Sequence, residues 1–309
     1  MFELPEFVTL AGQINETLTG KTIRKGNLGN TPHKFVWYNK SHAEFARLTQ
    51  GKTVGEARAK GKWLFISLEP GYVLLLGECG GKVLYHPAGS ELPSKYHLHI
   101  AFEDDSDLTV TTQMWGAMEL YESGQEQERQ YVKGMRPTPI EPQFTSDYFS
   151  TLIDSLLEGE KRSVKGLLTQ EQLVPGLGNA IAQDILFRAG LHPRHPIEGL
   201  NKNQRRKLYN AILKIVREAI KKGSRYDEYD LYNQPGRYLR FMDNKAAGHP
   251  CPKCGTEIES PVPGRRVLLL PTLSRMRTET HPTTTSNTCM PISLMVQLFY
   301  YSGACCDRA

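Results

Sequence analysis

Short apolar runs dominate the chain between about residue 20 and residue 122. They are rich in β-branched and aromatic side chains, and Gly, Pro, Asn and Asp separate them, which is typical of β-strands. The runs are KFVWYN, KWLFISLE, YVLLLGE, HLHIAFED and DLTVTTQ. Residues 8–18 have helical spacing instead. The pattern therefore predicts an all-β half, either a sandwich or a barrel, which a helix precedes.

Helical spacing takes over after a polar, proline-containing stretch at residues 123–143, which we interpret as an interdomain linker. Of three predicted helices, the first has Ser146 or Asp147 as its cap. The second begins at Asn179 and ends at Gly190. The third has one apolar side, made by Leu208, Ile212, Ile215 and Ala219.

Composition excludes some classes of protein. The chain has 309 residues, of which 39% are hydrophobic and 23% charged, as expected for a globular protein of about two domains. It has no signal peptide and no apolar run of about 18 residues, so we expect a cytoplasmic protein without a membrane partner. The net charge of +5 is compatible with nucleic acid as a partner.

The sequence GLGN at residues 176–179 could bind an anion. Glycines before a helix allow backbone N–H groups to approach a phosphate, and the helix dipole favours negative charge there. Gly178 would supply such an N–H group, and Asn179 would add a side-chain amide. An ordinary tight turn explains the same residues.

Cys251 and Cys254 have the spacing of half a tetrahedral zinc site. A second pair, expected roughly 15–20 residues later, is missing. With suitable codons, a reading frame shifted by one nucleotide after about residue 260 yields a strand that ends in C-x-x-C, followed by a stop. We therefore interpret residues 241–260 as a truncated zinc finger and residues 261–309 as a frameshifted tail, which the DNA sequence would test.

Several motifs stand in one order along residues 1–258: ELPE, GKW near residue 62, PGLGN, AGLHP and CPKCG. Together they resemble the formamidopyrimidine-DNA glycosylase and endonuclease VIII family. The resemblance implies an α+β multidomain fold, with a β-sandwich at residues 1–122, a helix–two-turn–helix domain at residues 144–240, and a zinc finger that is incomplete here. It also implies a bacterial-type, nucleoid-associated enzyme that flips a damaged base out of duplex DNA and excises it. We expect a monomer, because the sequence shows no coiled coil and no long apolar edge.

The resemblance implies catalytic roles near the amino terminus. In the family, a proline amine attacks the sugar C1′ atom, and a neighbouring glutamate handles protons. Phe2 stands at the proline position, so the terminal amine belongs to Met1, and lyase chemistry by the usual route is not expected. Glu3 matches the family carboxylate and could activate a water for simple hydrolysis, and Glu6 matches a second glutamate. Alternatively, both acids only stabilise a helix amino terminus.

Other positions are implied to meet DNA. Lys62 resembles a hairpin lysine that binds phosphate or acts as a substitute amine, and Asn179 resembles a phosphate-binding asparagine. Trp115, in the sequence QMWG, matches an aromatic wedge, although the arginine beside it in the family is missing here. A solvated Lys62 and a core Trp115 are the structural alternatives.

The leading interpretation is thus a DNA glycosylase without the usual lyase route. A catalytically inactive family member that binds damaged or duplex DNA is the alternative. A third interpretation is an inactive product of the frameshift, unable to close its zinc site.

Overall fold

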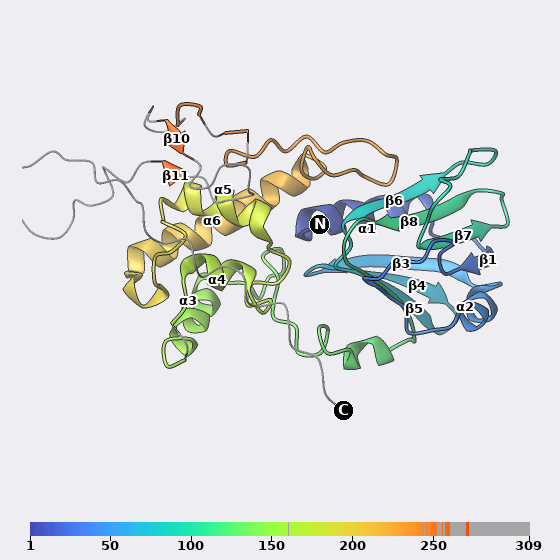
Figure 1. The fold of residues 1–309 in the computed structure, drawn as a ribbon. Coiled ribbons are helices and arrows are strands. Elements are labelled where there is room, and N and C mark those ends of the chain that lie inside the picture. Colours follow the sequence, from blue (N-terminus) through green and yellow to red (C-terminus); the bar gives the residue numbers. More distant parts are fainter. Residues whose placement is uncertain are drawn as a thin grey trace, which may run out of the picture. The chain divides into compact units, whose positions relative to one another are not determined.

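The computed structural model describes residues 1–159, 161–243, 245–246, 248–251, 255, 257–259 and 270–271. Residues Met1–Pro271 form one compact unit, in which a β-rich half precedes a helical half along the chain (Figure 1). The predicted α+β organisation is therefore confirmed.

Residues 1–122, all of which are described, contain two sheets. The five-stranded sheet has the order β2 (Val36–Trp37), β9 (Gly116–Glu122), β5 (Tyr72–Gly77), β4 (Trp63–Glu69) and β3 (Thr53–Lys60). The four-stranded sheet has the order β1 (Ile23–Asn27), β7 (Leu98–Phe102), β8 (Asp107–Thr112) and β6 (Gly81–His86). Paired strands are antiparallel except for β2 and β9, which are parallel.

Alternation along β4 separates two apolar cores. Leu64 and Ile66 belong to the core between the sheets, together with Val110 from the opposite sheet. Trp63 and Phe65 join another apolar cluster, because successive side chains of a strand point to opposite faces. Figure 1 shows the two sheets stacked as layers. This packing identifies a sandwich rather than a barrel.

The first helix, α1 (Leu4–Thr17), begins four residues before the predicted start. Glu3 is its N-cap and forms a capping box with Glu6, and Pro5 is accommodated in the first turn, where its missing N–H is not needed. A second helix, α2 (His42–Thr49), was not predicted. Its signal is local: Ser41 and Glu44 form a capping box at its start.

The helical half contains α3 (Ser146–Ser155), α4 (Val164–Thr169), α5 (Asn179–Ala189) and α6 (Lys202–Lys221), with the 3-10 turn η2 (Ile197–Gly199). Both predicted ends of α5 are confirmed. The predicted cap of α3 is wrong, because the Thr145 hydroxyl accepts the N–H of Tyr148. The apolar side predicted for α6 is buried in a core that also includes Leu4 of α1.

The predicted linker packs on the sandwich. It contains the 3-10 turn η1 (Gln125–Glu128). Val132 is buried against the cluster of Trp63 and Phe65 on the outer face of the five-stranded sheet. The Arg129 guanidinium lies 4.2 Å from the centre of the Trp63 ring and donates to Glu119 at 3.1 Å. This stretch therefore covers the outer face of the five-stranded sheet.

Near the carboxyl end, β10 (Ile258–Glu259) pairs antiparallel with β11 (Leu270–Pro271). Leu270 and Pro271 of β11 belong to the predicted frameshifted tail. Most of that tail lies outside the described residues, and so does Cys254. Within the described part of the chain, no helix combines the length and the apolar character that crossing a bilayer requires.

Candidate active site

The Glu3 carboxylate lies at the amino terminus of α5 and is only 4% exposed. Its Oε2 atom accepts the N–H groups of Gly178 at 2.8 Å and Ile181 at 3.2 Å. Its Oε1 atom accepts the N–H of Ala180 at 3.0 Å. Unpaired N–H groups and the positive end of the dipole make a helix start a natural site for an anion. The first helix of the chain thus supplies the anion that caps α5.

This contact requires the glycines of the GLGN turn. A Cβ atom on Gly178 would lie 2.5 Å from Glu3 Oε1, and one on Gly176 would lie 2.6 Å from Leu4 Cβ. Gly176 also has a φ of +91°, which glycine adopts readily. The Gly178 amide, which we predicted to approach a phosphate, is buried and donates to Glu3 instead. Asn179 is exposed beside it.

A buried arginine holds the second glutamate of the motif. Arg225, 3% exposed, donates from Nε to Glu6 Oε1 at 3.0 Å and from Nη2 to Glu6 Oε2 at 2.9 Å. Its Nη1 atom lies 3.8 Å from Glu3 Oε1. Burial alone would lower the pKa of Arg225, but the charges of Glu6 and Glu3 outweigh this effect and raise it. Glu6 also accepts the N–H of Glu3 at 2.8 Å, so it positions Glu3 from inside the protein.

Phe2 is a core residue whose nitrogen is fully engaged. The side chain is completely buried and meets Phe7 edge to face at 5.8 Å. Met1 precedes Phe2, so the Phe2 nitrogen is a peptide amide and no nucleophile, and its N–H donates to the carbonyl of Cys79 at 2.8 Å. Cys79 is itself buried, which raises the pKa of its thiol to about 12.

The amine at this site belongs to Met1. It lies 3.2 Å from Glu228 Oε1, and the Met1 carbonyl accepts Nη2 of Arg225 at 2.8 Å. Burial raises the pKa of Glu228, while Arg225 and the terminal amine oppose that shift. Sequence reasoning missed Arg225 and Glu228. The charged run RYDEYD was visible, but no local signal connects it to a partner more than 200 residues away.

Lys62 lies in the turn between β3 and β4, next to the GLGN turn. A Cβ atom on Gly176 would lie 3.0 Å from the carbonyl oxygen of Gly61, and Leu4 donates its N–H to Gly176 at 2.8 Å. Lys62 is half-buried, and no described residue forms an ion pair or hydrogen bond with its ammonium. The segments that carry Lys62, Glu3 and Asn179 therefore meet at one place.

Trp115 is exposed in the turn between β8 and β9, so the core alternative is wrong. Its carbonyl accepts the Thr112 hydroxyl at 2.6 Å. The indole packs against Trp37 of β2, with ring centres 5.2 Å apart.

The structure describes only one of the two predicted zinc ligands, Cys251. Cys251 is buried with Met242 and Ile258, while Cys254 lies outside the description. No group of three His, Cys, Asp or Glu side chains in the described part of the chain could hold a metal ion. The described residues therefore do not provide a zinc site, and no chemical step is assigned to zinc.

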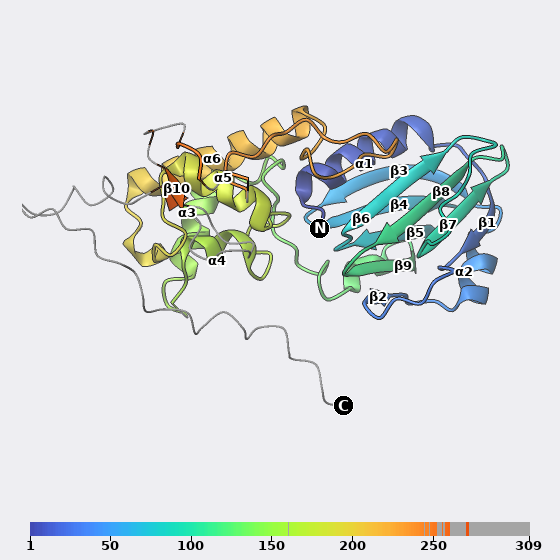
Figure 2. The same cartoon turned by 45° about the horizontal axis from the view of Figure 1, so that its top comes forward.

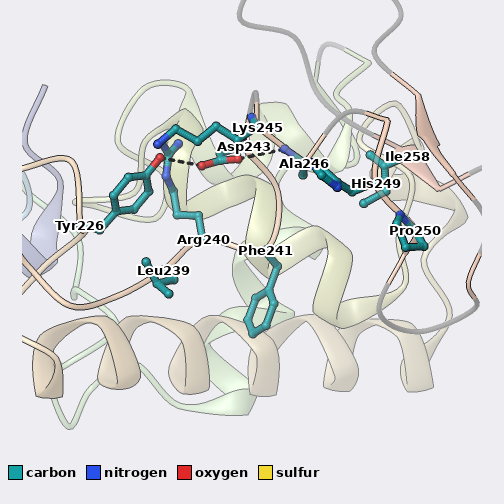
Figure 3. Close-up of a pocket in the computed structure, with 10 residues that line it drawn as sticks. All are labelled: Tyr226, Leu239, Arg240, Phe241, Asp243, Lys245, Ala246, His249, Pro250 and Ile258. Atoms are coloured by element: carbon teal, nitrogen blue, oxygen red, sulfur yellow. Dashed lines mark hydrogen bonds between the residues drawn. The ribbon is translucent and has the colours of Figure 1, made fainter.

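An open hollow of about 460 Å³ lies after α6, between Tyr226 and Ile258 (Figure 3). Asp243, the acid that lines it, accepts the Tyr226 hydroxyl at 2.8 Å and the N–H groups of Lys245 and Ala246. The Asp243 carboxylate therefore stabilises its own loop through these hydrogen bonds.

Asp184 of α5 binds the segment that leads into this hollow, at Tyr238, Phe241 and Met242. It is fully buried and accepts the Tyr238 hydroxyl and the Met242 N–H, each at 2.8 Å, and the Phe241 N–H at 3.2 Å. Burial raises the pKa of Asp184 to about 6, and the three hydrogen bonds oppose the shift.

Comparison with known proteins gives concordant results. Residues 1–118 match the family model of the formamidopyrimidine-DNA glycosylase N-terminal domain, and residues 135–228 match that of the H2TH domain. The formamidopyrimidine-DNA glycosylase of Bacillus licheniformis is 30% identical over 270 residues, which cover 86% of this chain and 96% of that protein. The enzyme of the same name from Symbiobacterium thermophilum is 29% identical, with 84% of each chain covered.

Solved structures show the same fold. The MutM (Fpg) protein from Thermus thermophilus has a TM-score of 0.72 and 25% identity, covering 86% of this chain and 96% of its own. The Lactococcus lactis Fpg in complex with DNA that contains an abasic site has a TM-score of 0.73 and 22% identity, with the same coverage.

Proposed function

The chain belongs to the formamidopyrimidine-DNA glycosylase family, and from this premise we propose that it is a base-excision-repair glycosylase, which cleaves the N-glycosidic bond of a damaged base in duplex DNA. The observation that carries this proposal is the Glu3 carboxylate, held by three N–H groups where the sandwich meets the helical half. The exposed side chain of Asn179 could bind a phosphate of the damaged nucleotide, while the fixed Glu3 carboxylate beside it faces the sugar.

Glu3 retains the capacity to act as a base. A carboxylate offers about four acceptor positions, and the N–H groups of Gly178, Ala180 and Ile181 occupy three of them. The remaining position can accept a proton from water. The water oxygen then bonds to C1′ while the bond from C1′ to the base nitrogen breaks, and the base leaves with the electron pair and takes up a proton. Glu6 and Arg225 are positioning residues in this scheme, because Glu6 accepts the N–H of Glu3 and Arg225 holds the Glu6 carboxylate.

Hydrolysis is the main route, because the Phe2 nitrogen is an amide. Borohydride traps the Schiff base that a lyase forms with abasic-site DNA. We expect no trapped adduct under conditions in which base release is complete. An adduct would overturn this point, and peptide mapping would then assign it to the Met1 amine or to Lys62.

Glu3→Gln tests the proposed function on duplexes that carry 8-oxoguanine, formamidopyrimidine, an oxidised pyrimidine or an alkylated base. Loss of a general base typically costs about 10²- to 10⁴-fold in rate, so single-turnover release should fall at least 100-fold. Glu16→Gln is the matched control, because Glu16 is exposed on the same helix.

Thermal unfolding should accompany the assay, because a glutamine amide would face N–H donors and loosen the site. Undiminished release by Glu3→Gln would exclude the role of Glu3. Duplex binding without release from any of the four substrates would identify the catalytically inactive DNA-binding protein instead.

A further inference from the structure

One side of α6 carries a row of exposed cations, which we call the basic stripe. The stripe consists of Arg206, Lys207, Lys214, Arg217 and Lys221. The other exposed residues of the helix are Lys202, Asn203 and Asn210, so the exposed surface of α6 contains no carboxylate. Residues three, four or seven positions apart lie on the same side of a helix. The positive charges of the stripe are therefore neighbours in space.

The basic stripe faces away from the core. Leu208, Ile212 and Ile215 lie on the opposite side of α6 and are buried in the core that α5 shares, and Figure 2 shows the two helices side by side. Packed helices lie about 8–10 Å apart from axis to axis. The thickness of α6 thus separates the stripe from α5 and from Asn179 at its start. The stripe is therefore a surface separate from the candidate active site.

The cations of the stripe have no ionic partner among the described residues. Two cations next to the stripe differ in this respect. Arg205 donates to Asp154 at 2.6 Å, and Lys222 pairs at 3.1 Å with Glu218, the one acid in the sequence of α6. Within the stripe, Arg206 donates only to the uncharged amide of Asn203, at 3.5 Å. The charge of the stripe is therefore not neutralised within the described part of the chain.

The stability of the helix does not explain the stripe. Like charges three or four residues apart repel each other, and Lys214, Arg217 and Lys221 have this spacing. The helix dipole favours a cation in the last turn, which accounts for Lys221, but it disfavours cations near the amino end. Lys207 lies near that end, and the first turn contains no acid. The arrangement therefore weakens the helix slightly, which fits a surface that binds an anionic partner.

We propose that the basic stripe binds the phosphate backbone of a second segment of duplex DNA, while the first segment, with the lesion, occupies the candidate active site. This inference rests on the proposed function. The helix rises by about 21 Å from Lys207 to Lys221, and the phosphates of one DNA strand recur about every 3.4 Å along the duplex. A duplex that lies along α6 therefore offers several phosphates to the stripe.

Two other anionic partners fit the stripe less well. A helix that binds a lipid surface buries an apolar side in it, but the apolar side of α6 is buried in the core of the protein. An acidic protein would need a row of carboxylates of matching length, whereas every duplex supplies regularly spaced charge. Phosphate contacts are independent of sequence and allow proteins to move along DNA. The stripe would therefore support the search for lesions by transfer between DNA segments.

The test first saturates the candidate active site with a short duplex that carries a non-cleavable tetrahydrofuran abasic-site analogue and one fluorophore. An undamaged duplex with a second fluorophore is then titrated, and energy transfer reports the complex that contains both. The wild-type chain should form this complex at low salt. For three phosphate contacts, the affinity for the second duplex should fall roughly 40-fold between about 50 and 200 mM salt, and further for more contacts.

A stripe variant combines Lys207→Gln, Lys214→Gln and Lys221→Gln. It should bind the second duplex more weakly, and the slope of log affinity against log salt should decrease by about 2.7, since each lost phosphate contact contributes about 0.9. Binding of the first duplex should not change. Glutamine and lysine have similar helix propensity, and thermal unfolding verifies that the variant is folded.

A control variant removes three exposed cations of the sandwich through Lys25→Gln, Arg47→Gln and Lys95→Gln. Its net charge equals that of the stripe variant, so the comparison separates the position of the charges from their number. The control variant should bind the second duplex as the wild-type chain does, with the same dependence on salt.

Absence of the complex with both duplexes at low salt would overturn the proposal. Equal weakening in the stripe and control variants would also overturn it, because binding would then follow net charge alone. Polyglutamate at equal charge is a further competitor. If it displaces the second duplex as well as unlabelled duplex does, the partner is an acidic protein and the proposal is wrong.

The result is independent of catalysis, because neither duplex releases a base. A chain that is inactive on every lesion could bind two duplexes, and an active glycosylase could bind only one. If the tetrahydrofuran duplex did not bind, the proposed function would fail. Titration of the undamaged duplex alone against the stripe and control variants would then still test the stripe, through the same difference in salt slope.

Discussion

Replacing Arg225 with methionine leaves Glu6 buried without its cation. Three hydrogen bonds from the Arg225 side chain and backbone to Glu6 are between 2.9 and 3.1 Å, and Glu6 is 1% exposed. Removing one partner of a buried ion pair costs about 3–5 kcal/mol, because the other charge stays desolvated. The whole domain is expected to be stable by only about 5–15 kcal/mol. We therefore expect the free energy of unfolding to fall by about a fifth or more.

Urea unfolding followed by circular dichroism measures this change. Arg205→Met is the comparison, because the Asp154 partner of Arg205 is largely exposed, and such a pair contributes no more than about 1 kcal/mol. The double variant Arg225→Met with Glu6→Gln should recover part of the loss, because the uncompensated charge is then removed. Base release should also slow in Arg225→Met, since Glu6 holds the N–H of Glu3.

Two results would refute the reasoning. A loss for Arg225→Met no greater than that for Arg205→Met would show that the pair contributes little. A double variant that is less stable than Arg225→Met would show that Glu6 stabilises the fold without its cation.

Three further predictions concern pH, salt and metal. Asp184 has a pKa of about 6 when folded against an ordinary 3.8, so the folded state binds more protons between those values. The free energy of unfolding should therefore fall as pH rises from about 4 to 6, by at most about 3 kcal/mol. Urea titrations of Asp184→Asn should show a weaker dependence of this free energy on pH, and an unchanged dependence would contradict the assignment. Lys62→Ala should reduce the slope of log affinity against log salt by about 1 in duplex titrations, whereas Asn179→Ala should weaken binding at an unchanged slope; equal slopes for both variants would exclude a phosphate contact of Lys62. Zinc should be well below one equivalent by elemental analysis, because Cys251 and Cys254 alone hold it poorly, and a full equivalent would show that other ligands complete the site.

Local sequence signals were sufficient for much of the fold. The ends of α5 follow from a glycine turn before Asn179 and from Gly190 after the last apolar residue, and both are observed. The helix α4 was missed because its six residues are too few for a helical period to be visible. The packing of the predicted linker on the sandwich was not predictable, because Val132 is buried in the cluster of Trp63 through a tertiary contact that no local pattern contains.

The candidate site was predictable only in its parts. The motif indicated Glu3 and Asn179, and their segments do meet at the start of α5. The use of the Gly178 amide for Glu3 rather than for a phosphate depends on two segments 175 residues apart. The burial of Arg225 against Glu6 has the same origin, since a charge is read from sequence as solvated until its partner is known.

Glu3 caps the amino termini of two helices. It is the N-cap residue of α1, and its carboxylate accepts N–H groups at the start of α5. The carboxylate that we propose as the catalytic base therefore also connects α1 to α5. Substitutions of Glu3 should therefore lower the melting temperature as well as the turnover rate. Few other side chains could accept the same N–H groups at the start of α5.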